Sequence, residues 1–191
     1  MNKRASATKA ERLLRRFWRH ARGQVAIEFA FLVPALVLFT MGTLEFGLIL
    51  SDYQRAGEAT RRAVRDLVIN PPLAALDTLA NDGTVVCTGS GGGVICTGGA
   101  VQGDASTTFT LLYDKMQDIF SDIQPQNVSI TYSATAGIDK ATNPGVVTPV
   151  VTLSLTGMRH EFLLLQIIPG LPDGFDLPSF ASSRISSTQA L

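Results

Sequence analysis

The chain has 191 residues, of which 46% are hydrophobic, enough for one domain with a packed core and an appendage. Its formal net charge is zero, but residues 1–23 carry eight Lys or Arg and one Glu, which leaves −7 on the rest. A basic tail can bind nucleic acid. This tail adjoins a long apolar run, and basic residues in that position hold the cytoplasmic end of a membrane helix, so we expect no nucleic-acid partner.

The apolar run extends from Phe29 to Leu50, 22 residues in which Glu45 is the only ionisable residue. A helix of that length reaches about 33 Å, and the hydrocarbon core of a bilayer is about 30 Å thick. Eight basic residues precede the run and four follow it within twenty residues, which places the N-terminus in the cytoplasm. A cleaved signal peptide fits less well, because Leu50-Ser51-Asp52-Tyr53 offers no small-x-small site.

A glycine and a carboxylate lie just before the apolar run, in the sequence Arg22-Gly23-Gln24-Val25-Ala26-Ile27-Glu28-Phe29. This sequence resembles the site that prepilin peptidases cut. The resemblance implies that Gly23 is the last leader residue, Gln24 the first mature residue, and Glu28 the glutamate that serves subunit assembly. Glycine suits a narrow peptidase cleft because it has no side chain to clash. The alternative is that Glu28 only marks the interfacial end of the helix.

Two further stretches extend the resemblance, Gly23 to Pro34 and Gly42 to Gly47. Their glycines, their Glu28-Phe29-Ala30 sequence, their proline and their acidic Glu45 are similar to the membrane region of the TadE-like family of tight-adherence pilus assembly proteins. The major pilin of such systems is very short, whereas this chain of 191 residues keeps 168 after Gly23, which implies a minor subunit. One departure is Gln24, where conventional type IV pilins usually have an N-methylated phenylalanine.

The resemblance implies a non-enzymatic pseudopilin, a minor pilin-like subunit for assembly of a tight-adherence (Flp, type IV-like) pilus. Its implied partners are a prepilin peptidase, the major Flp-type pilin and other pilin-like subunits, the inner-membrane assembly platform and membrane lipid. The implied location is the bacterial inner membrane, with a cytoplasmic N-terminus and a periplasmic domain; a place in the pilus itself is a further possibility. The alternative is an uncut bitopic inner-membrane protein with a periplasmic binding domain. We find no catalytic triad, and we expect no cofactor and no metal site.

Four residues of the apolar run are candidates for helix packing in the membrane: Pro34, Gly42, Glu45 and Gly47. Proline kinks a helix, and small residues let helices approach closely. Glu45 either faces a partner helix or extends toward water, and we favour the partner helix. Together with Ser51, Gly47 forms a small-xxx-small pair.

The helix should continue beyond the membrane to Asn70-Pro71-Pro72. Its apolar positions form one stripe: Ala56, Ala59, Ala63, Val64, Leu67 and Val68. On the opposite side, the i,i+4 spacing predicts ion pairs of Arg62 with Glu58 and with Asp66.

The only two cysteines, Cys87 and Cys96, flank a glycine-rich turn between β-prone residues. In an oxidising periplasm this arrangement predicts a disulfide across a hairpin. Neither Cys nor His lies nearby to complete a metal site.

The remaining pattern predicts an α+β fold: a pilin-like long N-terminal transmembrane helix, then a small periplasmic domain with an antiparallel sheet. A helix is expected over 106–123, and strands over 128–135 and 151–156. Phe162 to Pro169 is either the last core strand and turn or a docking surface, and we favour the core. The expected segments are a cleaved leader (1–23), a transmembrane segment (24–50), a periplasmic extension of the helix (51–70) and the domain (71–191).

Overall fold

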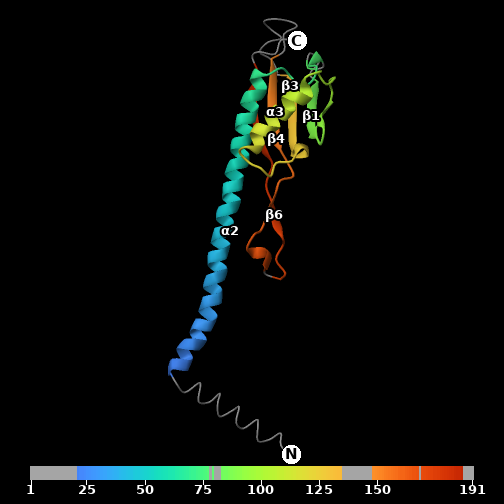
Figure 1. Ribbon diagram of the computed structural model, residues 1–191. Helices are drawn as coiled ribbons and strands as arrows, with labels where there is room; N and C mark the ends of the chain where they lie inside the picture. Colours follow the sequence, from blue (N-terminus) through green and yellow to red (C-terminus); the bar gives the residue numbers. More distant parts are fainter. Residues whose placement is uncertain (1–20, 78, 80–82, 135–147, 168, 187–191) are drawn as a thin grey trace, which may run out of the picture.

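The computed structural model describes residues 21–77, 79, 83–134, 148–167 and 169–186, so most of the predicted leader lies outside the described residues. A long helix, α2 (Ala21–Ile69), precedes a domain built mainly of antiparallel strands (Figure 1). The other elements are β1 (Thr84–Ser90), β2 (Gly93–Thr97), α3 (Ala105–Gln117), η2 (Pro125–Asn127), β3 (Val128–Ala134), β4 (Pro149–Leu155), β5 (Arg159–Glu161), η3 (Leu165–Ile167), β6 (Gly174–Asp176) and β7 (Phe180–Ile185). The predicted α+β class is confirmed.

Helix α2 has 49 residues and continues without a break through Pro34. At 1.5 Å per residue it is about 74 Å long. It ends at Ile69, as predicted, before Pro71 and Pro72. Beyond its end, the backbone and side-chain N–H groups of Asn70 both donate to the carbonyl of Asp66, at 3.1 and 2.9 Å. These bonds satisfy a carbonyl that the helix itself leaves without a partner.

The C-terminal half of α2 builds the domain core. The predicted apolar stripe is buried there, except that Val68 is only partly buried: Ala56, Ala59, Ala63, Val64 and Leu67. Five of the six predicted positions are alanine or valine, so the helix lies close to the strands behind it. This half of the helix belongs to the domain rather than to a separate stalk.

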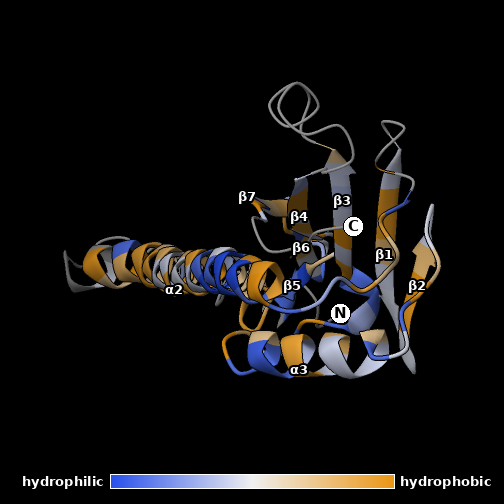
Figure 2. Ribbon diagram, turned by 90° about the horizontal axis from the view of Figure 1, so that it is seen from above, coloured by the Kyte–Doolittle hydropathy of each residue, from blue (hydrophilic) through white to orange (hydrophobic). Residues whose placement is uncertain are grey.

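The main sheet has five antiparallel strands in the order β2-β1-β3-β4-β7. In Figure 2, α2 approaches the sheet at β7 and α3 lies toward β1 and β2. Alternate side chains of the central strands are fully buried against the helices: Val128, Ile130 and Tyr132 on β3, and Val151, Leu153 and Leu155 on β4. The Ser and Thr residues between them are partly exposed, as the alternation predicted.

Tyr132 connects the sheet to the chain that leaves α2. Its hydroxyl oxygen accepts a hydrogen bond from the backbone N–H of Leu73 at 3.3 Å. Burial raises the pKa of Tyr132 to about 12, so the phenol stays neutral at physiological pH. A buried hydroxyl with a partner fixes the turn after α2 without placing a charge in the core.

Helix α3 is shorter than the 106–123 helix predicted from the apolar spacing. Phe120 and Ile123 are still buried, but turns rather than helix carry them into the core. The Tyr113 hydroxyl and the Gln117 amide both donate to the carbonyl of Ile123, at 2.9 and 3.2 Å. These two bonds hold the chain folded back on the helix end, so the burial pattern persists after the helix has ended.

The exposed face of α2 carries one of the two predicted ion pairs. Arg62 Nε donates to Glu58 Oε1 at 2.7 Å, and this bond lowers the pKa of the Glu58 carboxyl. The predicted pair of Arg62 with Asp66 is wrong, because Lys115 Nζ lies 2.6 Å from Asp66 Oδ2. Asp66 therefore joins α2 to α3, a contact that spacing along one helix does not reveal.

The stretch from Phe162 to Pro169 is not a core strand, so the favoured prediction is wrong. Strands β5 and β6 pair with each other, and the residues between them extend away from the main sheet. We call residues 159–176 the membrane-end hairpin, because in Figure 1 it points along α2 toward the N-terminus. The last strand of the main sheet is β7 instead.

The predicted disulfide is present. Cys87 and Cys96 face each other in the register of β1 and β2 and are bonded. Gly89 lies on the same strand, β1, two residues after Cys87. A Cβ at this position would collide with the carbonyl of Pro125 and the ring of Phe109. Gly91, in the turn of the same hairpin, has no neighbour within 4 Å of a Cβ.

We expect Gly89→Ala to destabilise the domain by about 1–3 kcal/mol, because the backbone of η2 must move to admit the methyl group. Gly91→Ala introduces the same methyl group into open space and is the matched control. Thermal unfolding of the detergent-solubilised full chain measures both variants. Equal melting temperatures for the two variants would show that β1 is not pressed against η2.

Candidate functional site

From Val25 to Leu44, the helix α2 is left uncovered by the other described parts of the chain. From Val25 to Leu44 no described side chain is buried. The exposed large apolar residues include Phe29, Phe31, Leu36, Phe39 and Leu44. Within the described residues, α2 is the one helix long and apolar enough to cross a membrane, which fits a single-pass membrane protein. A surface this apolar needs lipid or other apolar helices around it.

The predicted processing and assembly residues lie at the start of this exposed half. Gly23 and Gln24 are in the first turn of α2. Glu28 is exposed, and the described residues offer its carboxylate neither a hydrogen bond nor an ion pair. A partner for Glu28 would therefore come from outside the described chain or from a new amino terminus. The cleavage and assembly roles stay predictions.

The predicted helix-packing residues Pro34, Gly42 and Gly47 lie farther along the same half. A Cβ at Gly42 or Gly47 would meet nothing within 4 Å in the described structure. The two glycines thus leave shallow notches in the apolar surface, which a neighbouring helix can approach closely. Their packing role stays a prediction.

Glu45 differs from its neighbours, because its side chain is only 1% exposed. Its two carboxylate oxygens each accept a backbone hydrogen bond from the membrane-end hairpin. The Leu163 N–H donates to Oε1 at 2.8 Å, and the Leu164 N–H donates to Oε2 at 3.0 Å. A buried carboxylate is costly unless it is paired, and these two bonds offset that cost. The partner predicted for Glu45 was a neighbouring helix, whereas the structure supplies one from the same chain.

His160, on β5, completes this contact. Its Nδ1 lies 2.6 Å from Asp52 Oδ2, and its Nε2 lies 3.5 Å from Glu45 Oε1. The first distance is a short hydrogen bond, whereas the second is an ion-pair distance without a hydrogen bond. The imidazole is only 8% exposed. One ring therefore lies between two carboxylates of α2, bonded to Asp52 and facing Glu45.

Glu45, Asp52, His160 and the N–H groups of Leu163 and Leu164 form what we call the Glu45 cluster. Glu45 and Asp52 are seven residues apart, two helical turns, so they face the same side of α2. The cluster adjoins a groove of about 570 Å³ that is also lined by Ser121. The Nδ1 atom of His160 hydrogen-bonds Asp52, and its buried Nε2 lies 3.5 Å from Glu45, so both ring nitrogens face α2. The cluster is built to hold the hairpin against the helix.

Sequence reasoning singled out Glu45 but missed its partners. Asp52 two turns later was a usable signal, since two acids on one face require a polar partner opposite. His160 lies 108 residues from Asp52, and nothing in the local sequence connects them. The donors at Leu163 and Leu164 are backbone groups, which leave no signature in side-chain identity.

We expect Glu45→Ala to release the hairpin, because the N–H groups of Leu163 and Leu164 lose a charged acceptor. Each such bond contributes about 1.5–3 kcal/mol, so amide hydrogen exchange at Leu163 and Leu164 should accelerate roughly tenfold or more. Glu58→Ala removes a carboxylate from the exposed face of the same helix and is the control. Unchanged exchange in the 162–166 peptide of Glu45→Ala, in detergent or nanodiscs, would contradict the assigned contact.

The chain was also compared with known proteins. No curated protein and no solved structure matches it. The model of the family described as TadE-like protein matches residues 23–65. This match spans the uncovered half of α2, the Glu45 cluster's two helix residues and the start of the buried stripe. Residues 23–65, the part that carries the uncovered apolar helix, are therefore similar to the TadE-like family.

Proposed function

We propose that the protein is a minor pilin-like subunit, a pseudopilin, that serves assembly of a tight-adherence (Flp, type IV-like) pilus. The observation that carries the proposal is the TadE-like match to residues 23–65, which coincides with a helix whose apolar half nothing in the described chain covers. The TadE-like segment by itself indicates a pilin-like protein associated with such a pilus. The minor role and the processing step are our additions.

The shape of the molecule supports this role. A helix of 49 residues has one half built into a domain and the other half bare. In a bilayer, lipid surrounds the bare half. In a filament, the same apolar surface can pack against equivalent helices of other subunits, since both environments reward apolar contact. The notches at Gly42 and Gly47 and the bend that Pro34 permits suit that packing.

We infer a bacterial inner-membrane location, with the basic segment in the cytoplasm and the domain in the periplasm. Residues 24–50 then span the membrane, 51–70 extend the helix, and 71–191 form the domain. The disulfide between Cys87 and Cys96 supports an oxidising compartment for the domain. The proposed partners are a prepilin peptidase, the major Flp-type pilin, other pilin-like subunits and the inner-membrane platform.

Processing after Gly23 is the first test. Co-expression with the cognate prepilin peptidase should yield a product that begins at Gln24, and Gly23→Leu should block it because a bulky side chain cannot enter the cleft. Gly42→Leu places the same side chain farther along α2 and should be cut normally. Intact mass of the membrane-extracted protein reports each product. An intact N-terminus in cells that assemble pili would overturn processing and favour the uncut bitopic protein.

Glu28 provides the second test. Glu28→Leu should leave insertion and cutting intact, because losing a charge favours the membrane, while piliation falls roughly tenfold or more. A tenfold loss corresponds to about 1.4 kcal/mol of subunit affinity. Glu28→Asp, which keeps the charge, should restore part of the piliation, and Glu58→Leu should leave piliation unchanged.

The assumed partner of Glu28 is the amino terminus of Gln24. Mass spectrometry must therefore show that Gln24 has not cyclised to uncharged pyroglutamate, which would remove that partner. Normal piliation by Glu28→Leu, with normal co-purification of other subunits, would reduce Glu28 to an interfacial marker.

A further inference from the structure

The membrane-end hairpin has an uncharged, apolar tip. Between Glu161 and Asp173 the sequence is Phe-Leu-Leu-Leu-Gln-Ile-Ile-Pro-Gly-Leu-Pro, with no charged residue. Leu163 is 60% exposed and Leu171 45%, so these two large side chains of the tip are not buried in the domain. The charged residues of the hairpin lie at its neck, on or beside the paired strands β5 and β6.

The tip also has a fixed position along α2. The bonds from Leu163 and Leu164 hold it at Glu45, which precedes the end of the apolar run, Leu50, by five residues. At 1.5 Å per residue, Glu45 lies about 7 Å inside that end. The bond between His160 and Asp52 holds the neck about two turns farther out, just beyond Leu50.

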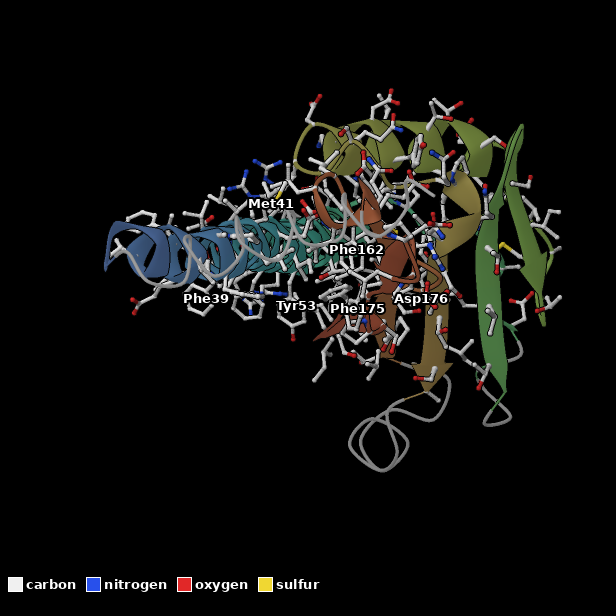
Figure 3. All side chains as sticks on the ribbon, turned by 90° about the horizontal axis from the view of Figure 1, so that it is seen from below. Phe39, Met41, Tyr53, Phe162, Phe175 and Asp176 are labelled. Carbon is white, nitrogen blue, oxygen red and sulfur yellow. A yellow bond between two sulfur atoms is a disulfide. The ribbon has the colours of Figure 1, made fainter. Side chains whose placement is uncertain are left out.

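Two views agree on the direction of the hairpin. Figure 1 shows it extending from the domain along α2 toward the N-terminus. Figure 3, seen from that end, shows Phe162 and Phe175 of the hairpin beside the helix. Phe175 is 49% exposed, so an aromatic ring at the neck adds to the apolar surface. Aromatic rings are enriched at the level of the lipid headgroups.

We propose that the tip of the membrane-end hairpin, residues 162–167 and 169–172, inserts into the outer leaflet of the membrane that α2 crosses, with Leu163 and Leu171 in contact with lipid. The proposal rests on the membrane position of α2. Amphipathic helices that lie in the interface bury their apolar face by about 5–10 Å, a depth similar to that of Glu45. The uncharged tip enters the leaflet, and the charged neck stays at its surface.

The insertion gives the Glu45 cluster a purpose. A loop in lipid cannot leave its backbone N–H groups without partners, because no water is available to them. The Glu45 carboxylate binds two of these N–H groups, and they in turn satisfy a carboxylate that is buried at membrane depth. The domain is then attached to the membrane at two places, α2 and the hairpin tip. Two attachments fix the tilt of the domain relative to the membrane as well as its distance from it.

Site-specific depth measurement tests the proposal. The two natural cysteines are bonded to each other, so one added cysteine can carry an environment-sensitive fluorophore in the full chain, reconstituted in vesicles. Leu163→Cys reports on the tip. Leu111→Cys on α3 is the matched control, because Leu111 is the same residue and is equally 60% exposed. Leu36→Cys reports on the apolar half of α2.

We expect lipids brominated on their acyl chains to quench the fluorophore at 163 and at 36 at least twofold more than at 111. Aqueous iodide should give the reverse order. One outcome would overturn the hairpin proposal alone: bromolipid quenches the fluorophore at position 36 but not at position 163, and iodide reaches position 163 as readily as position 111. Protection of 163 from iodide without quenching by bromolipid would also overturn it, since protein rather than lipid would then cover the tip. If bromolipid quenched neither position 36 nor position 163, both the hairpin proposal and the membrane position of α2 would be overturned.

Discussion

A carboxylate buried beside an apolar helix must find donors, and Glu45 finds them in its own chain. Its oxygens accept the N–H groups of Leu163 and Leu164, and His160 lies between it and Asp52. Removing Glu45 would take the acceptor from both N–H groups, and removing the hairpin would leave the buried carboxylate without these donors. This pairing brings the membrane-end hairpin to the helix. It also marks the point where α2 changes from a bare helix to a core element.

The change of environment along α2 determines how the molecule can work. Before Glu45 the described side chains are exposed and apolar, and after Asp52 one stripe is buried under the sheet and α3. A single unbroken helix transmits position rigidly between these two halves, because all of its backbone hydrogen bonds run along its axis. Any subunit that packs against the bare half would therefore orient the domain as well. This rigidity is what a pilin-like subunit needs if assembly in the membrane is to place a domain outside it.

Attachment of the hairpin adds a second constraint. A helix alone fixes how deep a domain sits but leaves it free to rotate about the helix axis and to tilt. The hairpin contacts α2 at Glu45 and again at Asp52, two turns farther along the same face, and these contacts remove part of that freedom. The hairpin is not part of the main sheet, whose edge strands are β2 and β7, and its strands pair only with each other.

Sequence by itself determined the elements whose signals are local. The apolar run, the prolines after Ile69, the buried alanine stripe, the alternating β3 and β4 and the pairing of Cys87 with Cys96 all follow from periodicity, turn residues or proximity along the chain. The end of α3, the partner of Asp66 and the path of residues 159–176 were decided only by the tertiary structure. Each depends on a contact between distant segments: Lys115 with Asp66, Tyr113 with a turn that folds back, and Glu45 with backbone groups 118 and 119 residues away. The run Phe162 to Leu165 has the composition of a core strand, and composition cannot distinguish burial in protein from exposure to another apolar environment, because the hydrophobic effect has no direction.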